Sequence, residues 1–192
     1  MARLEHPNCA TVLDVGMYAD MPFVVMDFVA GTNLKEVLAS GPLPPDRAID
    51  ITRQVLAGLS CAHEHGIIHR DIKPANIVLS QKSGLGDHVK ILDFGLAKFS
   101  QQASNLTSGL VVGTPAYMAP EQILGRPIDP RTDLYACGVL LFELLTGRTP
   151  FQPADNQPLS MCMMHLNVDP PALREAAGGA DFGALEGVVA RA

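Results

Sequence analysis

The sequence predicts an α+β domain that contains more helix than strand. Two short segments near the N-terminus, 12–15 and 23–29, are rich in valine and phenylalanine, which is typical of half-buried strands. Two longer segments, 45–65 and 131–146, carry apolar residues at helical spacing. The 192 residues, 47% of them hydrophobic, suit a single globular domain with a sizeable core.

The N-terminal part begins with the two predicted strands. We expect residues 17–22 to form the turn between them. Gly31 interrupts the strand pattern, and 33–39 is a candidate for a short helix that ends at the Ser-Gly-Pro sequence of 40–42.

The two long helices have recognisable ends. Pro45 suits a first helical turn and Gly66 suits a C-terminal cap. The apolar residues of the first helix form one stripe: Ala48, Ile51, Val55, Leu59 and Ala62. The second helix is apolar on almost all sides and ends at Gly147, and a helix without a polar face belongs in the centre of a domain.

Shorter elements are predicted elsewhere. Segments 77–79 and 88–92 are strand candidates, and an irregular stretch follows them to about residue 121. So long a connection inside a compact domain is uncommon and usually functional. In the C-terminal tail, 155–166 and 181–192 are expected to be helices.

Charge and cysteine content narrow the partners and the location. The net charge of -6 argues against a nucleic-acid or anionic-membrane surface, because both favour clustered lysine and arginine. The four cysteines contain no C-x-x-C pair and predict the reduced thiols of a cytoplasmic protein. The apolar stretches are too short for a membrane span and the N-terminus is no signal peptide, although an anchor could lie outside this segment in a longer parent chain.

Three motifs contain the candidate chemistry. They are His-Arg-Asp-Ile-Lys-Pro-Ala-Asn at 69–76, Asp-Phe-Gly at 93–95 and Ala-Pro-Glu at 119–121. Phosphoryl transfer needs a carboxylate to accept a proton from a hydroxyl, a cation to offset phosphate charge, and oxygen ligands for Mg²⁺. The motifs supply these residue types as Asp71, Lys73, Asn76 and Asp93.

In this order and at these distances, the three motifs resemble the catalytic half of a protein kinase. Lys73 beside Asp71, and the Gly-Thr-Pro sequence at 113–115 before Ala-Pro-Glu, are similar to serine/threonine kinases. The resemblance is to the bacterial eukaryotic-like branch of that family, and it covers essentially the whole chain.

The resemblance implies a protein-kinase-like fold. Residues 29–192 would form a mostly α-helical large lobe, incomplete at its C-terminus, and residues 1–28 would be a remnant of the β-rich small lobe. The implied activity is transfer of the γ-phosphate of ATP, with Mg²⁺, to serine or threonine of a protein substrate.

The resemblance also assigns further site residues. Thr114 is expected to hydrogen-bond to Asp71 and Lys73 and so orient the substrate hydroxyl. ATP would contact a gatekeeper, two hinge residues, a polar residue near the ribose and an apolar floor under the adenine, which are Met26, Asp27, Val29, Asn33 and Val78. Met26 equally suits a plain core position. Asn76 and Asp93 would hold the metal.

Two more residues have expected supporting roles. Asp133 matches a family aspartate that holds the backbone of the catalytic loop, and it also suits an N-terminal helix cap. Arg70 would pair with a phosphorylated residue between the second and third motifs, where Thr107 and Ser108 are the best placed.

Parts of the family pattern have no counterpart in the sequence. The glycine-rich loop and the strand-borne lysine come before the region that begins at Met1. The arginine that pairs with Glu121 in the family would follow Ala192. We therefore expect a fragment that is inactive alone, marginally stable and prone to aggregate.

Two other functions stay open. A pseudokinase-type binding module would keep the large lobe without catalysis, although Asp71, Lys73, Asn76 and Asp93 all stand here. A small-molecule kinase shares the large-lobe design, but it typically lacks the Ala-Pro-Glu segment and the equivalent of Lys73. The expected partners are ATP and a protein substrate, without nucleic acid, and the family also allows a homodimer through the kinase domains of the parent.

Overall fold

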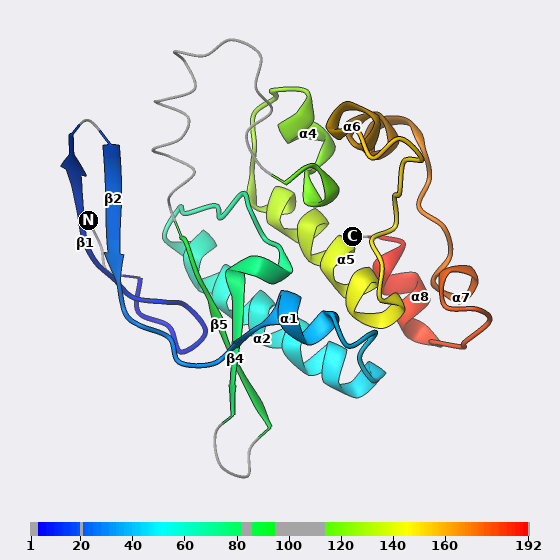
Figure 1. The fold of residues 1–192 in the computed structure, drawn as a ribbon, viewed down its shortest axis with the longest axis horizontal. Coiled ribbons are helices and arrows are strands. Elements are labelled where there is room, and N and C mark those ends of the chain that lie inside the picture. Colours follow the sequence, from blue (N-terminus) through cyan, green and yellow to red (C-terminus); the bar gives the residue numbers. More distant parts are fainter. Residues whose placement is uncertain (1–3, 20, 82–85, 95–113, 192) are drawn as a thin grey trace.

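The computed structural model describes residues 4–19, 21–81, 86–94 and 114–191. Its strands are β1 (Val12–Tyr18), β2 (Met21–Met26), β3 (Thr32–Asn33), β4 (Ile77–Gln81) and β5 (Asp87–Ile91). Its α-helices are α1 (Leu34–Leu38), α2 (Pro45–Glu64), α4 (Pro120–Ile123), α5 (Pro130–Thr146), α6 (Pro158–Asn167), α7 (Leu173–Ala176) and α8 (Ala184–Val189). Figure 1 shows the helices gathered around α5 and the β1–β2 hairpin at one side. The prediction of a mostly helical α+β fold is confirmed.

Helix α5 lies in the core, as its apolar sequence predicts. Asp129 caps its first turn by accepting a hydrogen bond from the N–H of Arg131 at 2.8 Å, and Gly147 ends it with a φ of 74°. The helix begins one residue earlier than predicted because Pro130 fits the first turn. Its fully buried side chains include Leu140, Phe142 and Leu144, and they belong to one hydrophobic core with buried residues of α2, β4 and β5.

Helix α2 packs along α5 and leads into residues 67–76, the predicted catalytic loop. Pro45 occupies its first turn as predicted, and all five residues of the predicted apolar stripe are buried. Gly66 follows the helix with a φ of 69°, a left-handed conformation that glycine adopts at little cost. The chain thereby turns from α2 into residues 67–76.

The described strands form two antiparallel sheets, β3–β4–β5 and β1–β2. In the β1–β2 hairpin the pairing runs from Val12 opposite Met26 to Tyr18 opposite Met21. The predicted turn over 17–22 is wrong, because β1 continues through Tyr18 and β2 begins at Met21. Pro22 lies opposite Met17 in this pairing, and proline within sheets is confined to edge strands, which both strands of a two-stranded sheet are.

The C-terminal tail folds against α5 in shorter helices than predicted. Helix α6 covers Pro158–Asn167 in place of 155–166, and α8 covers Ala184–Val189 in place of 181–192. Helix α7 was not predicted, because four residues are too few to show a period.

The cysteines are free and mostly buried, as the sequence predicts. Cys9, Cys137 and Cys162 are buried, Cys61 is partly buried, and all four are free thiols. Within the described ranges, no helix is both long and apolar enough to cross a membrane.

Candidate active site

Four predicted site residues converge on one point. The Nζ atom of Lys73 lies 2.7 Å from Oδ2 of Asp71 and 2.8 Å from Oγ1 of Thr114. The Nδ2 atom of Asn76 donates to Oδ2 of Asp71 at 3.0 Å and to the Asp71 carbonyl oxygen at 2.8 Å. The Asp71 side chain is 36% exposed, so its carboxylate is open to a ligand.

Local sequence produces this loop. Ile72 is fully buried, whereas the flanking Asp71 and Lys73 are only partly buried, as alternation along an extended segment requires. A 3-10 turn over Pro74–Asn76 then follows, with the Asn76 N–H donating to the Lys73 carbonyl oxygen at 3.0 Å. The turn brings the side chain of Asn76 back onto Asp71.

Asn76 and Asp93 offer the oxygen atoms that Mg²⁺ prefers. Nδ2 of Asn76 donates to Asp71, so Oδ1 of Asn76 is the amide atom that is left to bind a metal. The N–H of Leu92 donates to the Asn76 carbonyl oxygen at 2.8 Å, so Asp93 follows directly beside the catalytic loop. The described residues contain no group of three His, Cys, Asp or Glu that could hold a metal. Mg²⁺ in nucleotide sites needs only one or two protein oxygens, with phosphate and water as the other ligands, so the two residues fit it.

His69 holds the catalytic loop against the segment after β5. Its Nε2 donates to the Leu92 carbonyl oxygen at 2.7 Å, and its Nδ1 accepts from the N–H of Asp71 at 3.3 Å. Its ring meets that of Phe94 edge-on, with the centroids 4.8 Å apart. Burial lowers the pKa of His69, which favours the neutral imidazole that these two hydrogen bonds require.

Asp133 holds the same loop from α5. Its Oδ1 accepts from the N–H of Arg70 at 2.8 Å, and its Oδ2 accepts from the N–H of His69 at 2.9 Å. The Nε2 of His63 lies 2.7 Å from Oδ2, and Asp133 is fully buried. These contacts match the expected holding role, whereas the capping interpretation of Asp133 is wrong because Asp129 caps α5.

Strained backbone occurs at two motif positions. Arg70 has a φ of 69° and Asp93 a φ of 62°, a left-handed conformation that costs a residue other than glycine about 1–3 kcal/mol. Arg70 directly precedes Asp71. Strain of this kind persists only where surrounding contacts hold it, and it clusters at functional sites.

The residues expected to contact adenine lie at the end of β2, directly after β2, and in β4. Met26 ends β2 and is partly buried, and the N–H of Asp27 donates to the Thr11 carbonyl oxygen at 3.0 Å. Val29 is partly buried, and Val78 of β4 is buried. The contacts of these residues with a nucleotide stay predictions.

Asn33 has a structural role at the start of α1. Its Oδ1 accepts from the N–H of Lys35 at 2.8 Å and so caps the helix. Its Nδ2 donates to the Ala75 carbonyl oxygen at 2.6 Å. Asn33 therefore joins α1 to the catalytic loop, and its contact with a ribose stays a prediction. Thr107 and Ser108 lie outside the described residues, as does Gly95.

Two polar pairs join the segment around the third motif to α5. The hydroxyl of Tyr117 donates to Oε2 of Glu143 at 2.6 Å, and Oγ1 of Thr132 donates to Oε1 of Glu121 at 2.5 Å. Burial raises the pKa of Glu143. Sequence reasoning missed Glu143, although an acidic residue among the apolar residues near the end of α5 is a signal, because a half-buried carboxylate needs a hydrogen-bond donor.

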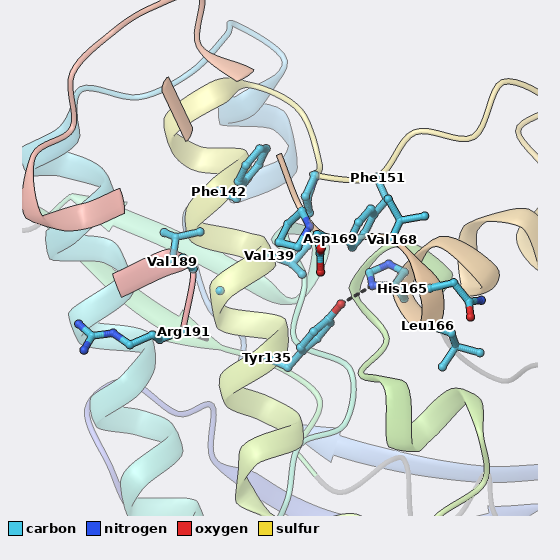
Figure 2. A pocket seen from close by; sticks show the side chains of 15 residues that line it. Tyr135, Val139, Phe142, Phe151, His165, Leu166, Val168, Asp169, Val189 and Arg191 are labelled. Carbon is cyan, nitrogen blue, oxygen red and sulfur yellow. Dashed lines mark hydrogen bonds between the residues drawn. The ribbon is translucent and has the colours of Figure 1, made fainter. Parts of the chain in front are cut away.

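A pocket of about 430 Å³ lies between α5, α6 and α8 (Figure 2). The hydroxyl of Tyr135 lies 2.7 Å from Nδ1 of His165, and the ring of Phe151 meets that of His165 edge-on. Burial lowers the pKa of His165 to about 4. None of the predicted site residues lines this pocket.

The site therefore combines a carboxylate, a lysine and two side chains with oxygen atoms suited to Mg²⁺, all on loops of a mostly helical lobe. This combination is typical of a class of phosphoryl-transfer proteins. The sequence model of the protein kinase domain matches residues 1–173. The chain belongs to the protein kinase family.

The most similar relatives include bacterial serine/threonine-protein kinases. The chain is 44% identical to pkn3 of Myxococcus xanthus over 176 residues, which cover 88% of this chain and 32% of that protein. It is 42% identical to PknL of Mycobacterium tuberculosis over 172 residues, which cover 89% of this chain and 42% of that protein.

Solved structures agree with these relatives. The crystal structure of the Mycobacterium tuberculosis PknI kinase domain matches with a TM-score of 0.74 at 29% identity, covering 99% of this chain and 65% of that one. The chain thus spans less than half the length of these curated relatives and about two thirds of the solved domain.

Proposed function

We propose that this segment performs the phosphoryl-transfer step of a serine/threonine protein kinase. Asp71 orients the hydroxyl of a substrate serine or threonine and accepts its proton. Lys73 offsets charge on the transferring phosphoryl group, and Thr114 helps to orient the hydroxyl. The observation that supports this most directly is the placement of Lys73 Nζ, 2.7 Å from Asp71 and 2.8 Å from Thr114.

ATP and Mg²⁺ are the proposed ligands. Asn76 and Asp93 would hold Mg²⁺, which when bound would neutralise charge on the phosphates. The adenine would lie on Val78, beside Met26 and the backbone of Asp27 and Val29. Asn33 would lie near the ribose.

The proposal includes a division into two lobes and a contact of Arg70 with a phosphorylated residue. Residues 1–28 belong to the small lobe and residues 29–192 to the large lobe, a division supported by the separate β1–β2 sheet. Arg70 would receive a phosphate carried by Thr107 or Ser108.

The 192 residues alone are not expected to transfer phosphate efficiently. Positioning supplies most of the rate in this chemistry, and the family's glycine-rich loop and strand-borne lysine are not in the sequence. A non-catalytic binding module and a small-molecule kinase are the second and third candidates, and the contact of Lys73 with Asp71 and Thr114 favours the protein kinase.

The free thiols support a cytoplasmic location. A homodimer through the kinase domains of a longer parent belongs to the same proposal.

Nucleotide titration tests the ligand assignment on the chain itself. NMR signals of Val78 and of the Asn76 side-chain amide are followed during addition of ATP, with and without Mg²⁺. We expect shifts at Val78 in both titrations and Mg²⁺-dependent shifts at Asn76. In Asp93→Asn the Mg²⁺-dependent part should weaken about tenfold or more, because a charged ligand is replaced by a neutral one.

Asp46→Asn is the matched control, because Asp46 is exposed in the first turn of α2. It should bind Mg²⁺ and ATP like the unchanged chain. Mg²⁺-dependent shifts that survive Asp93→Asn in full would contradict the metal assignment.

A further inference from the structure

The peptide groups on both sides of Arg70 are fixed by two different helices. The Arg70 N–H donates to Oδ1 of Asp133, in α5, at 2.8 Å. The Arg70 carbonyl oxygen accepts from Nε2 of Gln122, in α4, at 2.9 Å. Arg70 has a φ of 69°, and a strained residue keeps its conformation only when neighbouring groups hold it.

The side-chain amide of Gln122 has two separate partners. Its Oε1 accepts from the N–H of Ala119 at 3.1 Å, which is a contact within the first turn of α4. Its Nε2 donates to the catalytic loop, 52 positions away in the sequence. The acceptor thus serves the helix and the donor serves the loop, so the two functions can be separated by substitution.

We propose that Gln122 is a positioning residue for Asp71. The Arg70 carbonyl and the Asp71 N–H belong to one planar peptide group, so a donor that fixes the carbonyl also fixes the direction of that N–H. The Asp71 N–H donates to Nδ1 of His69 at 3.3 Å, and Asn76 Nδ2 donates to the Asp71 side chain at 3.0 Å. Gln122 therefore links the fold of α4 to the orientation of Asp71.

This inference rests on the proposed function for the catalytic role of Asp71. The hydrogen bond between Gln122 and the Arg70 carbonyl oxygen is independent of that function. The inference assigns a structural role to Gln122, the residue that follows the Ala-Pro-Glu motif. Only a side chain that carries both an acceptor and a donor can make the two contacts, and glutamine at this distance provides both.

Three variants of the chain separate the two contacts. Gln122→Glu keeps an acceptor for the Ala119 N–H and removes the donor to Arg70. Gln122→Met has a similar length and removes both. Gln152→Glu is the control, because Gln152 is exposed and is not one of the proposed site residues. The readouts are the NMR hydrogen-exchange rates of the Asp71 and Ala119 amides and the chemical shift of the Asn76 side-chain amide.

In Gln122→Glu, we expect the Asp71 amide to exchange about fivefold or more faster, which corresponds to loss of one ordinary hydrogen bond. The Asn76 side-chain signal should shift, and the Ala119 amide should be nearly unchanged. In Gln122→Met all three should change, and in Gln152→Glu none should. If only Ala119 and its neighbours in α4 respond in either Gln122 variant, Gln122 is a helix cap alone and the proposal is overturned.

A second measurement needs no substitution. The through-hydrogen-bond coupling between the Gln122 side-chain nitrogen and the Arg70 carbonyl carbon should be detectable in the unchanged chain. Its absence, in spectra where such couplings are seen for α5, would overturn the proposal even if a variant failed to fold. Neither readout depends on phosphoryl transfer, so a failure of the proposed function would be recognised separately.

Discussion

Gly31 shows at the scale of one residue how closely the segment after β2 approaches β4. A Cβ atom on Gly31 would lie 2.4 Å from the Leu79 carbonyl oxygen and 2.7 Å from Cγ1 of Val78. The first of these atoms is strand backbone, which cannot move without breaking pairs of the β3–β4–β5 sheet. The predicted adenine floor at Val78 therefore depends on the absence of a side chain at Gly31.

We predict that Gly31→Ala lowers the free energy of unfolding by about 1–3 kcal/mol, the usual cost of overpacking. Urea denaturation measures the change. Gly187→Ala is the control, because a Cβ there meets only the Arg191 side chain at 4.0 Å, and it should be neutral or slightly stabilising. Equal stability of Gly31→Ala and the unchanged chain would show that the segment and β4 separate easily.

The predicted site residues differ in how far the sequence could place them. Asp71, Lys73 and Asn76 lie within six positions, so one loop conformation suffices to bring them together. The contacts of Gln122 and His63 with this region could not be predicted, because sequence spacing says nothing about which side chains meet across helices. Asn33 was assigned to the nucleotide, yet its polar atoms have backbone partners.

At the scale of elements, the ends of the two long helices were predicted well, whereas the ends of the C-terminal helices and of the first two strands were predicted poorly. Helices α2 and α5 begin at prolines and are followed by Gly66 or Gly147, which are physical stop signals. The hairpin turn was misplaced because Ala19, which turns with a φ of 46°, carries no such signal. Short elements such as α7 are fixed by packing rather than by a local pattern.

Helix α6 supplies a pH-dependent contact with α5. Burial lowers the pKa of His165 to about 4, below the ordinary value of 6.5. The unfolded chain therefore binds more protons than the folded chain between these values, so stability falls as the pH falls below about 6.5. From pH 7 to pH 5 this one group should remove about 2 kcal/mol.

We predict that His165→Phe reduces the loss of unfolding free energy between pH 7 and pH 5 by about that amount. Urea denaturation at the two pH values measures it. The variant will also lose the contact with Tyr135, so the slope with pH, and not the value at pH 7, is decisive. His69, whose pKa burial also lowers, titrates in both chains and cancels in the comparison. Equal slopes would contradict this account of His165.

At the scale of the whole molecule, the β1–β2 hairpin exposes apolar surface. Directly paired residues share a face, and one face carries Tyr18, Met21, Phe23 and Val25, each between 42% and 74% exposed. An exposed two-stranded sheet with unpaired edges is prone to self-association. We therefore predict that the hairpin is the main site of self-association of the chain.

Val25→Lys should reduce aggregation, because the new charge lies on this face directly opposite Asp14 and forms a favourable cross-strand pair. Light scattering against protein concentration measures the effect. Leu159→Lys, at a 70% exposed position of α6, removes apolar surface without touching the hairpin. If Leu159→Lys suppresses aggregation as strongly as Val25→Lys, the hairpin is not the main site of association.

Asp71 is proposed to accept the proton of a substrate hydroxyl. The most direct measurement uses a chimera in which residues 1–192 replace the matching segment of the pkn3 kinase domain, because the match covers only 32% of that longer protein. Turnover of ATP and Mg²⁺ on a protein substrate is measured for the chimera, its Asp71→Asn variant and the 192 residues alone. We predict clear serine or threonine labelling by the chimera, a fall in kcat of about 10²–10⁴-fold in Asp71→Asn with ATP affinity largely kept, and negligible labelling by the chain alone. Undiminished turnover in the folded Asp71→Asn chimera would contradict the account.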